Sequence, residues 1–379
     1  MHKSVAFFPW VRIDDRLDEG RLRFIPYVRG EEPGTKAPVS QGALDRVIAA
    51  YVNPPRTPIH ECTLIELDDW TIGQDMPLPG QIWLARTCIG MAGLSSRRLF
   101  RRHFDYCNFD TYQLVIQRFN EDSAGTFSFT ARRRDGVVNH IWDAEGFVWR
   151  RPPHVPSHAR LSSDEAHYAA TLLATCAKDA GLSEALEEFT LANTDSPDVP
   201  VHAEVVMLKS AFEWLYGINE NVEEFVRALA ADVGHLLATP NEVPDSVRTH
   251  WASASPKATR PLMAWARDLC KLRGAAAHGK SVRHERFRWS PEAHLAFASV
   301  LFPLLVRHRL RCTGALPDDA FERARLKYIE HLLVPELFAS QGDEEHPWSR
   351  FELRCRSAEL EEHLRREIDR IDGGKGDEI

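Results

Sequence analysis

A proline-rich segment divides this chain into two parts with different hydrophobic patterns. Residues 151–157 read Arg-Pro-Pro-His-Val-Pro-Ser. Proline fixes the backbone φ angle and lacks an amide donor, so a cluster of prolines ends both helices and strand ladders. The 379-residue length is sufficient for two or three domains of about 100 to 200 residues each. We therefore predict a domain junction here, with one domain over residues 1–155 and a second that begins at residue 160.

The first 155 residues are expected to form an α+β domain. Short runs of alternating or β-branched residues, separated by Pro and Gly, predict strands, and two stretches have helical spacing. The predicted strands span residues 5–13, 63–67, 112–118, 126–132 and 146–150, and the predicted helices span residues 42–51 and 82–102. No motif in this domain indicates its role.

Residues 160–312 are expected to form an all-α bundle of antiparallel helices, because apolar residues recur there at three- and four-residue spacing. Ser162 or Ser163 is a candidate cap for a first helix that continues to about residue 180, and Ser290 caps a last helix from Pro291 to about residue 310. Two helices between them are predicted over residues 201–216 and 261–273. Their inward stripes are Val205, Leu208, Phe212, Leu215 and Tyr216 in the first, and Leu262, Trp265, Leu269 and Leu272 in the second.

Residues 313–379 are expected to add a helical extension and a polar tail. Leu360, Leu364, Ile368 and Ile371 line one side of a charged helix before the tail at residues 373–379. That stripe fits either packing on the same chain or contact with a second copy, and the pattern leaves both open.

The charge of the chain is unevenly distributed. The formal net charge of -8 argues against a protein that coats nucleic acid along its whole surface, because phosphate binding needs dense positive charge. Residues 181–225 are strongly acidic, whereas residues 257–288 contain nine lysines and arginines against two acids. This basic window is either the anion-binding part of the protein or a solvated face that pairs with the acidic window.

The sequence indicates a cytoplasmic protein without a bound metal or cofactor. No apolar run reaches the roughly 18 to 20 residues that cross a bilayer, and the N-terminus has no hydrophobic signal-peptide region. The seven cysteines are widely spaced and never form a C-x-x-C pair, which is typical of free thiols in a reducing compartment.

The motif with the clearest chemical meaning lies inside the basic window. Residues 272–279 read Leu-Arg-Gly-Ala-Ala-Ala-His-Gly, which places Arg273 and His278 five residues apart. On a regular helix this spacing turns about 140° around the axis, so the two side chains would share a face only if Gly274 or Gly279 distorted the helix. A guanidinium and an imidazole that meet over one phosphate can cleave RNA without a metal, because the 2′-hydroxyl of RNA is its own nucleophile.

This segment resembles the HEPN superfamily of the abortive-infection type. The resemblance covers about 150 residues and includes the motif at residues 272–279, the upstream helix at residues 208–215 and the closing helix at residues 301–305. It implies a metal-independent endoribonuclease, a toxin or antiviral defence effector, in which Arg and His of an R-x4-6-H motif from two protomers meet at a dimer interface. The catalytic pair here is then Arg273 and His278, and Glu213 resembles an acidic residue that orients the arginine.

Further residues and partners follow from this interpretation. Lys271, Lys280, Arg283 and Arg286 are expected to bind the RNA backbone. The expected partners are an RNA substrate, a second copy of the chain, and an antitoxin, an activator or a phage component, with no membrane. The N-terminal domain is expected to act in sensing or regulation.

Two other interpretations stay open. Members of the family commonly have a polar residue directly after the arginine, whereas this chain has Gly274, and that difference favours a non-catalytic module that dimerises or holds a partner. In addition, Arg273 and His278 suit a helix C-terminus, where positive charge is favoured by the helix dipole whatever the protein does.

Overall fold

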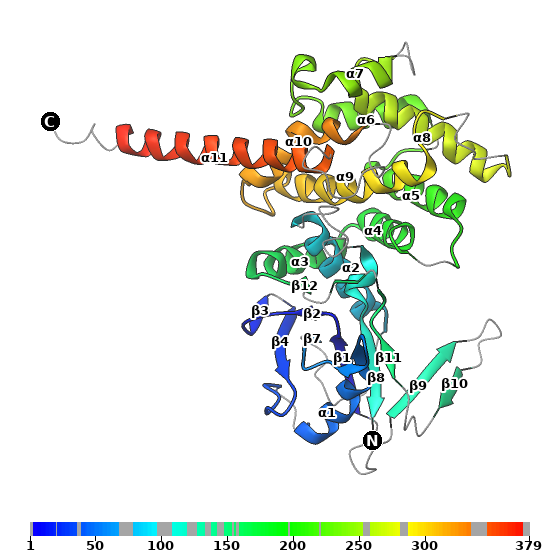
Figure 1. Ribbon diagram of the computed structural model, residues 1–379, viewed down its shortest axis with the longest axis vertical. Helices are drawn as coiled ribbons and strands as arrows, with labels where there is room; N and C mark the ends of the chain where they lie inside the picture. The colour runs from blue at the N-terminus through cyan, green and yellow to red at the C-terminus, as the bar shows by residue number, and fades with distance from the viewer. Residues whose placement is uncertain are drawn as a thin grey trace. The chain divides into compact units, whose positions relative to one another are not determined.

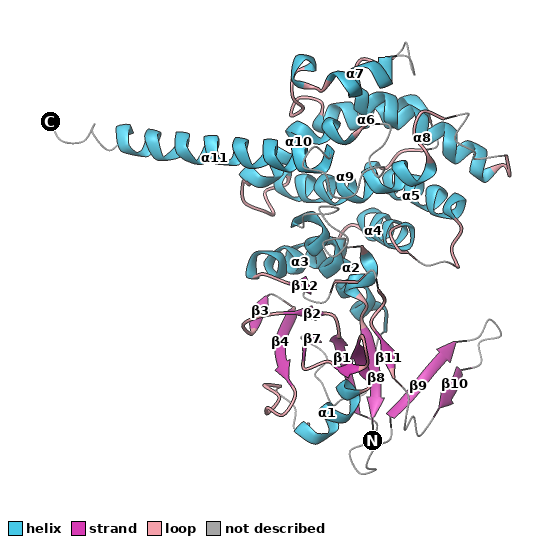
Figure 2. Ribbon diagram, viewed as in Figure 1, coloured by secondary structure: helices cyan, strands magenta, loops and turns pink. Residues whose placement is uncertain are grey.

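We describe the fold from a computed structural model of the chain (Figure 1). The described residues are 3–19, 21–35, 39–67, 79–96, 108–119, 127–132, 138–141, 148–153, 155–156, 159–195, 198–219, 221–252, 258–280, 287–334 and 347–373. Strands belong to the N-terminal region and helices dominate the C-terminal region (Figure 2). The expected order of an α+β part followed by a helical part is therefore confirmed.

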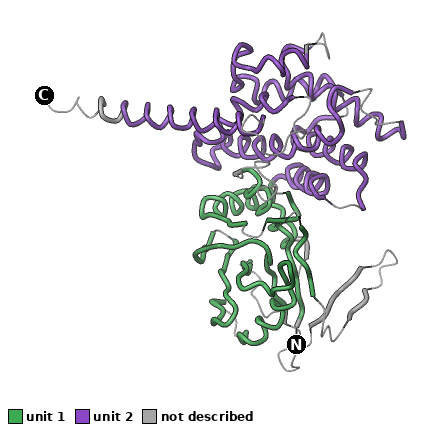
Figure 3. Tube along the Cα trace, in the orientation of Figure 1, with its two compact units in different colours: residues 1–97, 104–178 green, residues 98–103, 179–379 purple. Residues whose placement is uncertain are grey.

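The chain forms two compact units (Figure 3). Unit 1 contains residues 1–97 and 104–178, and unit 2 contains residues 98–103 and 179–379. The main division follows Lys178, so the helix at Ser163–Cys176 belongs to unit 1 rather than to the helical domain in which we expected it.

Unit 1 is built on a seven-stranded sheet whose neighbouring strands are all antiparallel. The strand order is β10-β9-β8-β1-β7-β4-β3. The strands are β1 (Lys3–Phe8), β3 (Leu17–Glu19), β4 (Leu22–Val28), β7 (Glu61–Leu67), β8 (Val115–Phe119), β9 (Phe127–Arg132) and β10 (Val138–Ile141). Phe7 of the central strand β1 lies opposite Leu64 on one side and Val115 on the other, and all three belong to the same face of the sheet.

The remaining described elements of unit 1 are short strands, three α-helices and one 3-10 helix. The strands are β2 (Val11–Arg12), β5 (Tyr51–Asn53), β6 (Thr57–Pro58), β11 (Trp149–Arg150) and β12 (Ala159–Arg160). The helices are α1 (Gln41–Ala49), α2 (Pro79–Ser96), the 3-10 helix η2 (Phe109–Tyr112) and α3 (Ser163–Cys176). Tyr27 of β4 donates a hydrogen bond to Asp45 of α1 at 2.9 Å, which fixes α1 on the face of the sheet that carries Tyr27.

The regular elements among the described residues of unit 2 are all helices. Its elements are α4 (Ala180–Ala192), α5 (Val201–Tyr216), α6 (Val222–Val233), η3 (Pro240–Glu242), α7 (Asp245–Ala252), α8 (Pro261–Ala277), α9 (Pro291–Cys312), α10 (Ala320–Tyr328), η5 (Ile329–Leu332) and α11 (Pro347–Gly373). Phe212 of α5 is fully buried at the centre, with ring contacts to Phe225 of α6, Trp265 of α8 and Phe302 of α9. These aromatic contacts join four helices in one core.

Several sequence predictions about unit 2 are confirmed. The helix predicted at residues 201–216 has these bounds, and four of its five stripe residues are buried, while Tyr216 is half-buried. All four stripe residues of α8 are buried as well. Ser290 caps α9 by accepting a hydrogen bond from the backbone of Ala293, and Pro261 is the first residue of α8.

A buried carboxylate fixes the start of α8. Glu330 is 1% exposed, accepts a hydrogen bond from the Leu262 backbone N–H at 3.0 Å, and pairs with Arg260 at 2.9 Å. Because the first amides of a helix have no partner inside the helix, this carboxylate satisfies one of them. The contact ties α8, the helix that carries the Arg273 motif, to the η5 segment.

Candidate functional site

The C-terminal end of α8 carries the motif at residues 272–279, and its geometry is that of a regular, capped helix. Gly279 has a φ of 64°, in the left-handed region that glycine adopts easily. Three backbone hydrogen bonds close the end: His278 N–H to Gly274 O at 3.2 Å, Gly279 N–H to Ala276 O at 3.2 Å, and Lys280 N–H to Ala275 O at 2.9 Å. This pattern is a Schellman motif with Gly279 as its left-handed residue.

The distortion that we expected between Arg273 and His278 is therefore absent. The helix continues through Ala277, and His278 is its C-cap residue. Five residues of regular helix separate the two side chains by about 140° around the axis. One chain consequently does not bring Arg273 and His278 together on one face, because Gly279 acts after the histidine and Gly274 lies within regular helix.

Both predicted catalytic residues nevertheless lie near the surface of unit 2. Arg273 is half-buried, and His278, Lys271 and Lys280 are exposed. Within the part of the chain that the structure describes, no ion pair involves Lys271, His278 or Lys280. Arg283 and Arg286, which we expected to bind RNA, lie outside the described residues.

Glu213 lies in a charged cluster between α5 and α8. Its carboxylate accepts a hydrogen bond at 2.7 Å from Lys209, a buried lysine whose ammonium also lies 4.7 Å from the centre of the Phe225 ring. Burial raises the pKa of the nearby Cys270 thiol to about 11; the charges acting on it include Lys209, Glu213 and Arg273. The charges of Glu213 and Arg273 thus influence the same thiol, but the side chain that donates a hydrogen bond to Glu213 is Lys209.

The basic window is divided between structural and exposed side chains. Arg267 of α8 forms a 2.7 Å hydrogen bond with Glu223 of the acidic window, and Arg260 pairs with Glu330. Arg288 donates at 2.7 Å to the backbone carbonyl of His250. These three arginines stabilise the fold, so part of the window pairs internally, while Lys271 and Lys280 at the end of α8 stay exposed.

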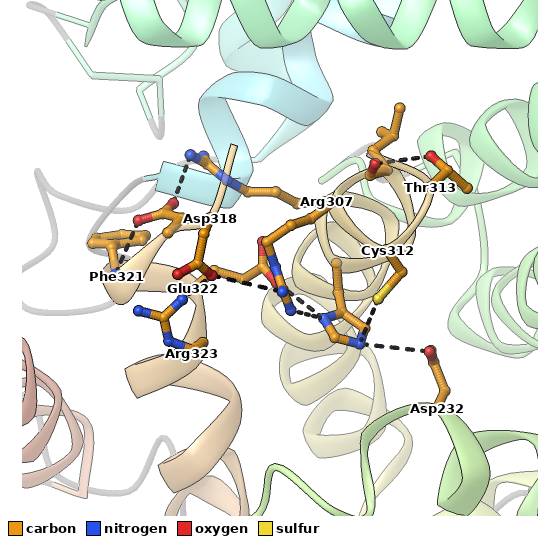
Figure 4. Close-up of polar contacts among 12 residues, drawn as sticks. Asp232, Arg307, Cys312, Thr313, Asp318, Phe321, Glu322 and Arg323 are labelled. Atoms are coloured by element: carbon orange, nitrogen blue, oxygen red, sulfur yellow. Dashed lines mark hydrogen bonds and ion pairs between the residues drawn. The ribbon is translucent and has the colours of Figure 1, made fainter. Parts of the chain in front are cut away.

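A second polar cluster, which the sequence analysis missed, surrounds the end of α9 (Figure 4). The imidazole of the buried His308 lies 3.5 Å from the Cys312 sulfur through Nε2 and 3.0 Å from Glu322 through Nδ1. Asp232 of α6 lies 3.7 Å from Nε2, and Arg311 lies 2.6 Å from Nδ1. The only sequence signal is the spacing of residues 308, 311 and 312 on one side of a helix end.

A thiol, an imidazole and a carboxylate in this order resemble a nucleophile with its base, but two features oppose that role. Cys312 is the last residue of α9, and the negative end of a helix dipole disfavours a second negative charge there. The guanidinium of Arg311 and the carboxylate of Glu322 both contact Nδ1 of His308 and bond to each other at 3.0 Å. The cluster therefore joins α6, α9 and α10.

A cavity of about 420 Å³ lies beside this cluster, and its polar groups already have partners within unit 2. It is lined by Leu215, Tyr216, Ala228, Ala231, Asp232, Leu305 and Arg309. The Tyr216 hydroxyl donates to Asp232 at 2.9 Å, and Arg309 donates to the backbone carbonyl of Leu215. A mainly aliphatic wall with satisfied polar groups does not identify a ligand.

Two further observations concern the described residues only. They contain no group of three or more His, Cys, Asp or Glu side chains with the arrangement of a metal site. Nor does any helix among them have both the length and the apolar composition needed to span a membrane.

No protein-family model, curated protein or solved structure matches this chain. The residues at the end of α8 and the helical character of unit 2 are thus the basis for a functional proposal.

Proposed function

We propose that this protein is a metal-independent endoribonuclease, of the toxin or antiviral-effector type, whose active site needs two copies of the chain. One copy supplies Arg273 and the other supplies His278. The observation that supports a shared site is the regular end of α8, on which these two side chains are about 140° apart, with Arg273 half-buried and His278 exposed. A two-fold axis near this helix end would place each arginine beside the histidine of the other copy.

The chemistry follows from the residue types. His278 removes the proton of the ribose 2′-hydroxyl, whose oxygen attacks the adjacent phosphorus, or donates a proton to the departing 5′-oxygen. The bond between phosphorus and the 5′-oxygen breaks, which leaves a 2′,3′-cyclic phosphate and a 5′-hydroxyl. Arg273 stabilises the charge that develops on the phosphate oxygens through paired hydrogen bonds. Lys271 and Lys280 position the backbone of the RNA, and Arg283 and Arg286 are proposed to do the same.

The resemblance to HEPN domains of the abortive-infection type supports Arg273 and His278 as the catalytic pair. It also implies the proposed dimer. Glu213 is proposed to orient Arg273, since the charges of both residues influence the Cys270 thiol. A sensing or regulatory role for unit 1, and control by an antitoxin, an activator or a phage component, belong to this proposal as well.

The first test measures cleavage of total cellular RNA in the presence of EDTA, with the products analysed for cyclic phosphate ends. We expect the Arg273→Ala and His278→Ala variants each to lose about 100-fold or more in rate, because an acid or base and an oxyanion donor each contribute at least that much. His235→Ala, which changes an exposed histidine elsewhere in unit 2, is the control and should keep full activity. Cleavage that survives either active-site change would exclude the proposed pair.

The shared site has a sharper test. Arg273→Ala and His278→Ala chains are each expected to be inactive alone, but a mixed dimer contains one intact site with Arg273 and His278 from different copies. An equal mixture of exchanging chains should therefore recover about a quarter of the wild-type rate. If both residues act from one chain, mixing restores nothing.

The second candidate is a non-catalytic module, and the Schellman cap favours it, because a half-buried arginine and a C-cap histidine stabilise a helix end without any reaction. A folded protein that leaves RNA intact, and in which both alanine variants lose only stability, would select this function. Thermal unfolding curves of both alanine variants, recorded beside the RNA assay, distinguish a loss of stability from a loss of cleavage.

A further inference from the structure

Helix α11 has one face that packs on unit 2. Trp348, Phe351 and Cys355 are almost fully buried on this face. Further along it, Glu359 accepts a hydrogen bond from Arg325 of α10 at 2.7 Å, and Glu362 pairs with Arg323. The inner face therefore has apolar contacts at the start of the helix and ion pairs after them.

The opposite face of α11 carries four large apolar side chains that are more than half exposed. Leu353 is 67% exposed, Leu360 58%, Leu364 52% and Ile368 57%. At about 100° per residue these positions fall within roughly 80° of one another, and they point away from Phe351 and Cys355. In Figure 1 the C-terminal end of α11 extends beyond α9 and α10.

Nothing comparable exists elsewhere in the described residues. The other large apolar side chains that are exposed there are Trp83, Val148, Trp149, Leu191 and Trp214, which do not form a stripe along a helix. A row of leucines over several helical turns is matched best by another helix with the same row.

Over residues 353–364 the spacing on the outer face is that of a short coiled coil. With Leu353 and Leu360 at position d, Leu364 falls at position a and Ser357 at the a position before it. The next d position is Glu367 and Ile368 falls at position e, so the apolar seam is confined to residues 353–364. Arg356 and Glu361 then flank the stripe at positions g and e. Both are exposed, and no ion pair joins either of them to another residue in the described ranges.

We propose that α11 pairs with α11 of a second copy as a parallel two-stranded coiled coil. In this orientation a g residue lies near the e residue five positions later in the other helix, so Arg356 of each copy faces Glu361 of the other. The two opposite-charge pairs favour a second copy over an unrelated apolar partner. The packed residues Cys355 and Glu362 occupy position f, opposite the seam, so the rest of unit 2 lies clear of the interface.

This inference does not depend on the proposed nuclease function, since no residue of α8 takes part. It is tested on the full chain by sedimentation equilibrium over about 1 to 300 µM, a range that covers weak association. We expect a monomer–dimer equilibrium in wild-type protein and an association at least about 100-fold weaker in the Leu360→Glu/Leu364→Glu variant. Leu191→Glu makes the same change at a single exposed leucine of α4 and should leave association unchanged.

Charge reversal tests the partner and the orientation together. Arg356→Glu and Glu361→Arg should each weaken self-association about 10-fold, because each places like charges across the seam. An equal mixture of the two variants should form heterodimers of wild-type strength, since every pair is then opposite in charge. A wild-type monomer at about 300 µM, or self-association whose strength is the same in wild-type protein and in the leucine variant, would overturn the proposal.

Discussion

Glu204 lies at the start of a helix in an environment that disfavours its charged form. It lies in the first turn of α5 and is 7% exposed. Burial raises its pKa to about 7, and the charge of Asp195 adds to the effect. An unfolded glutamate titrates near 4.3, so this carboxyl holds its proton in the folded state over a range in which the unfolded chain has lost it.

The stability of the protein should therefore depend on pH through Glu204. A raised carboxyl pKa contributes stability below the unfolded pKa, and this contribution is lost as pH rises through about 7. Relative to Glu204→Gln, we expect the wild-type free energy of unfolding to fall by about 2 to 3 kcal/mol between pH 5 and pH 8. Urea unfolding of both proteins at several pH values measures this difference, and parallel curves would contradict it.

The comparison with the glutamine variant is needed because buried histidines act with the opposite sign. Burial lowers the pKa of His331 to about 4 and also lowers the pKa of His294. A lowered histidine pKa reduces stability as pH falls below about 6.5, since the unfolded state then binds the proton more tightly. The difference between wild type and Glu204→Gln cancels these contributions.

At the scale of the element, the end of α8 is determined by one glycine. Gly279 needs its positive φ for the Schellman motif, whereas Gly274 lies within the helix and a Cβ there would meet nothing within 4 Å. The two glycines of the motif thus have different roles, although they look equivalent in the sequence.

Alanine substitutions at these two positions should have opposite effects on stability. We expect Gly279→Ala to destabilise the protein by about 1 to 2 kcal/mol, because alanine is strained in the left-handed region. Gly274→Ala should stabilise it by about 0.5 to 1 kcal/mol through helix propensity. Thermal unfolding of the two variants measures these effects, and each variant serves as the control for the other. Equal changes in melting temperature would contradict the Schellman geometry at Gly279.

Some elements were missed although their signals are present. Helix α6 begins after Asn221, which accepts hydrogen bonds from the backbone of Glu223 and Glu224, and its buried residues Phe225, Leu229 and Val233 follow four-residue spacing. A cap followed by this spacing is sufficient to predict a helix. Strand β4 was harder to predict from the sequence. Its residues are largely buried and include a proline, so the run lacks the alternation by which a half-buried strand is recognised.

At the scale of the whole molecule, the RNA binding that we propose would have to be local. A net charge of -8 repels RNA over most of the surface, so the exposed lysines at the end of α8 are expected to contribute most of the attraction.

Salt dependence of RNA binding tests this localisation. In a His278→Ala background, which prevents cleavage, Lys271→Ala and Lys280→Ala should each reduce the slope of log affinity against log salt by about 0.7. Lys178→Ala removes an exposed charge from unit 1 and should leave the slope unchanged. Anisotropy of a labelled single-stranded RNA between roughly 50 and 200 mM NaCl measures the slopes, and equal losses from all three lysines would disprove a local site.

The sequence by itself determined the order of an α+β part and a helical part, the bounds of α5, the first residue of α8, the cap of α9, and the largely buried stripes of both α5 and α8. Hydrophobic periodicity and capping residues act over a few neighbouring positions, so a local pattern records them. Only the tertiary structure decided that α3 belongs to unit 1 and that the helix is regular between Arg273 and His278. It also separated Arg260, Arg267 and Arg288, which have structural partners, from the exposed Lys271 and Lys280. These outcomes depend on partners that are distant in sequence, such as Glu330 and Glu223, and no local pattern records which distant residue a side chain will meet.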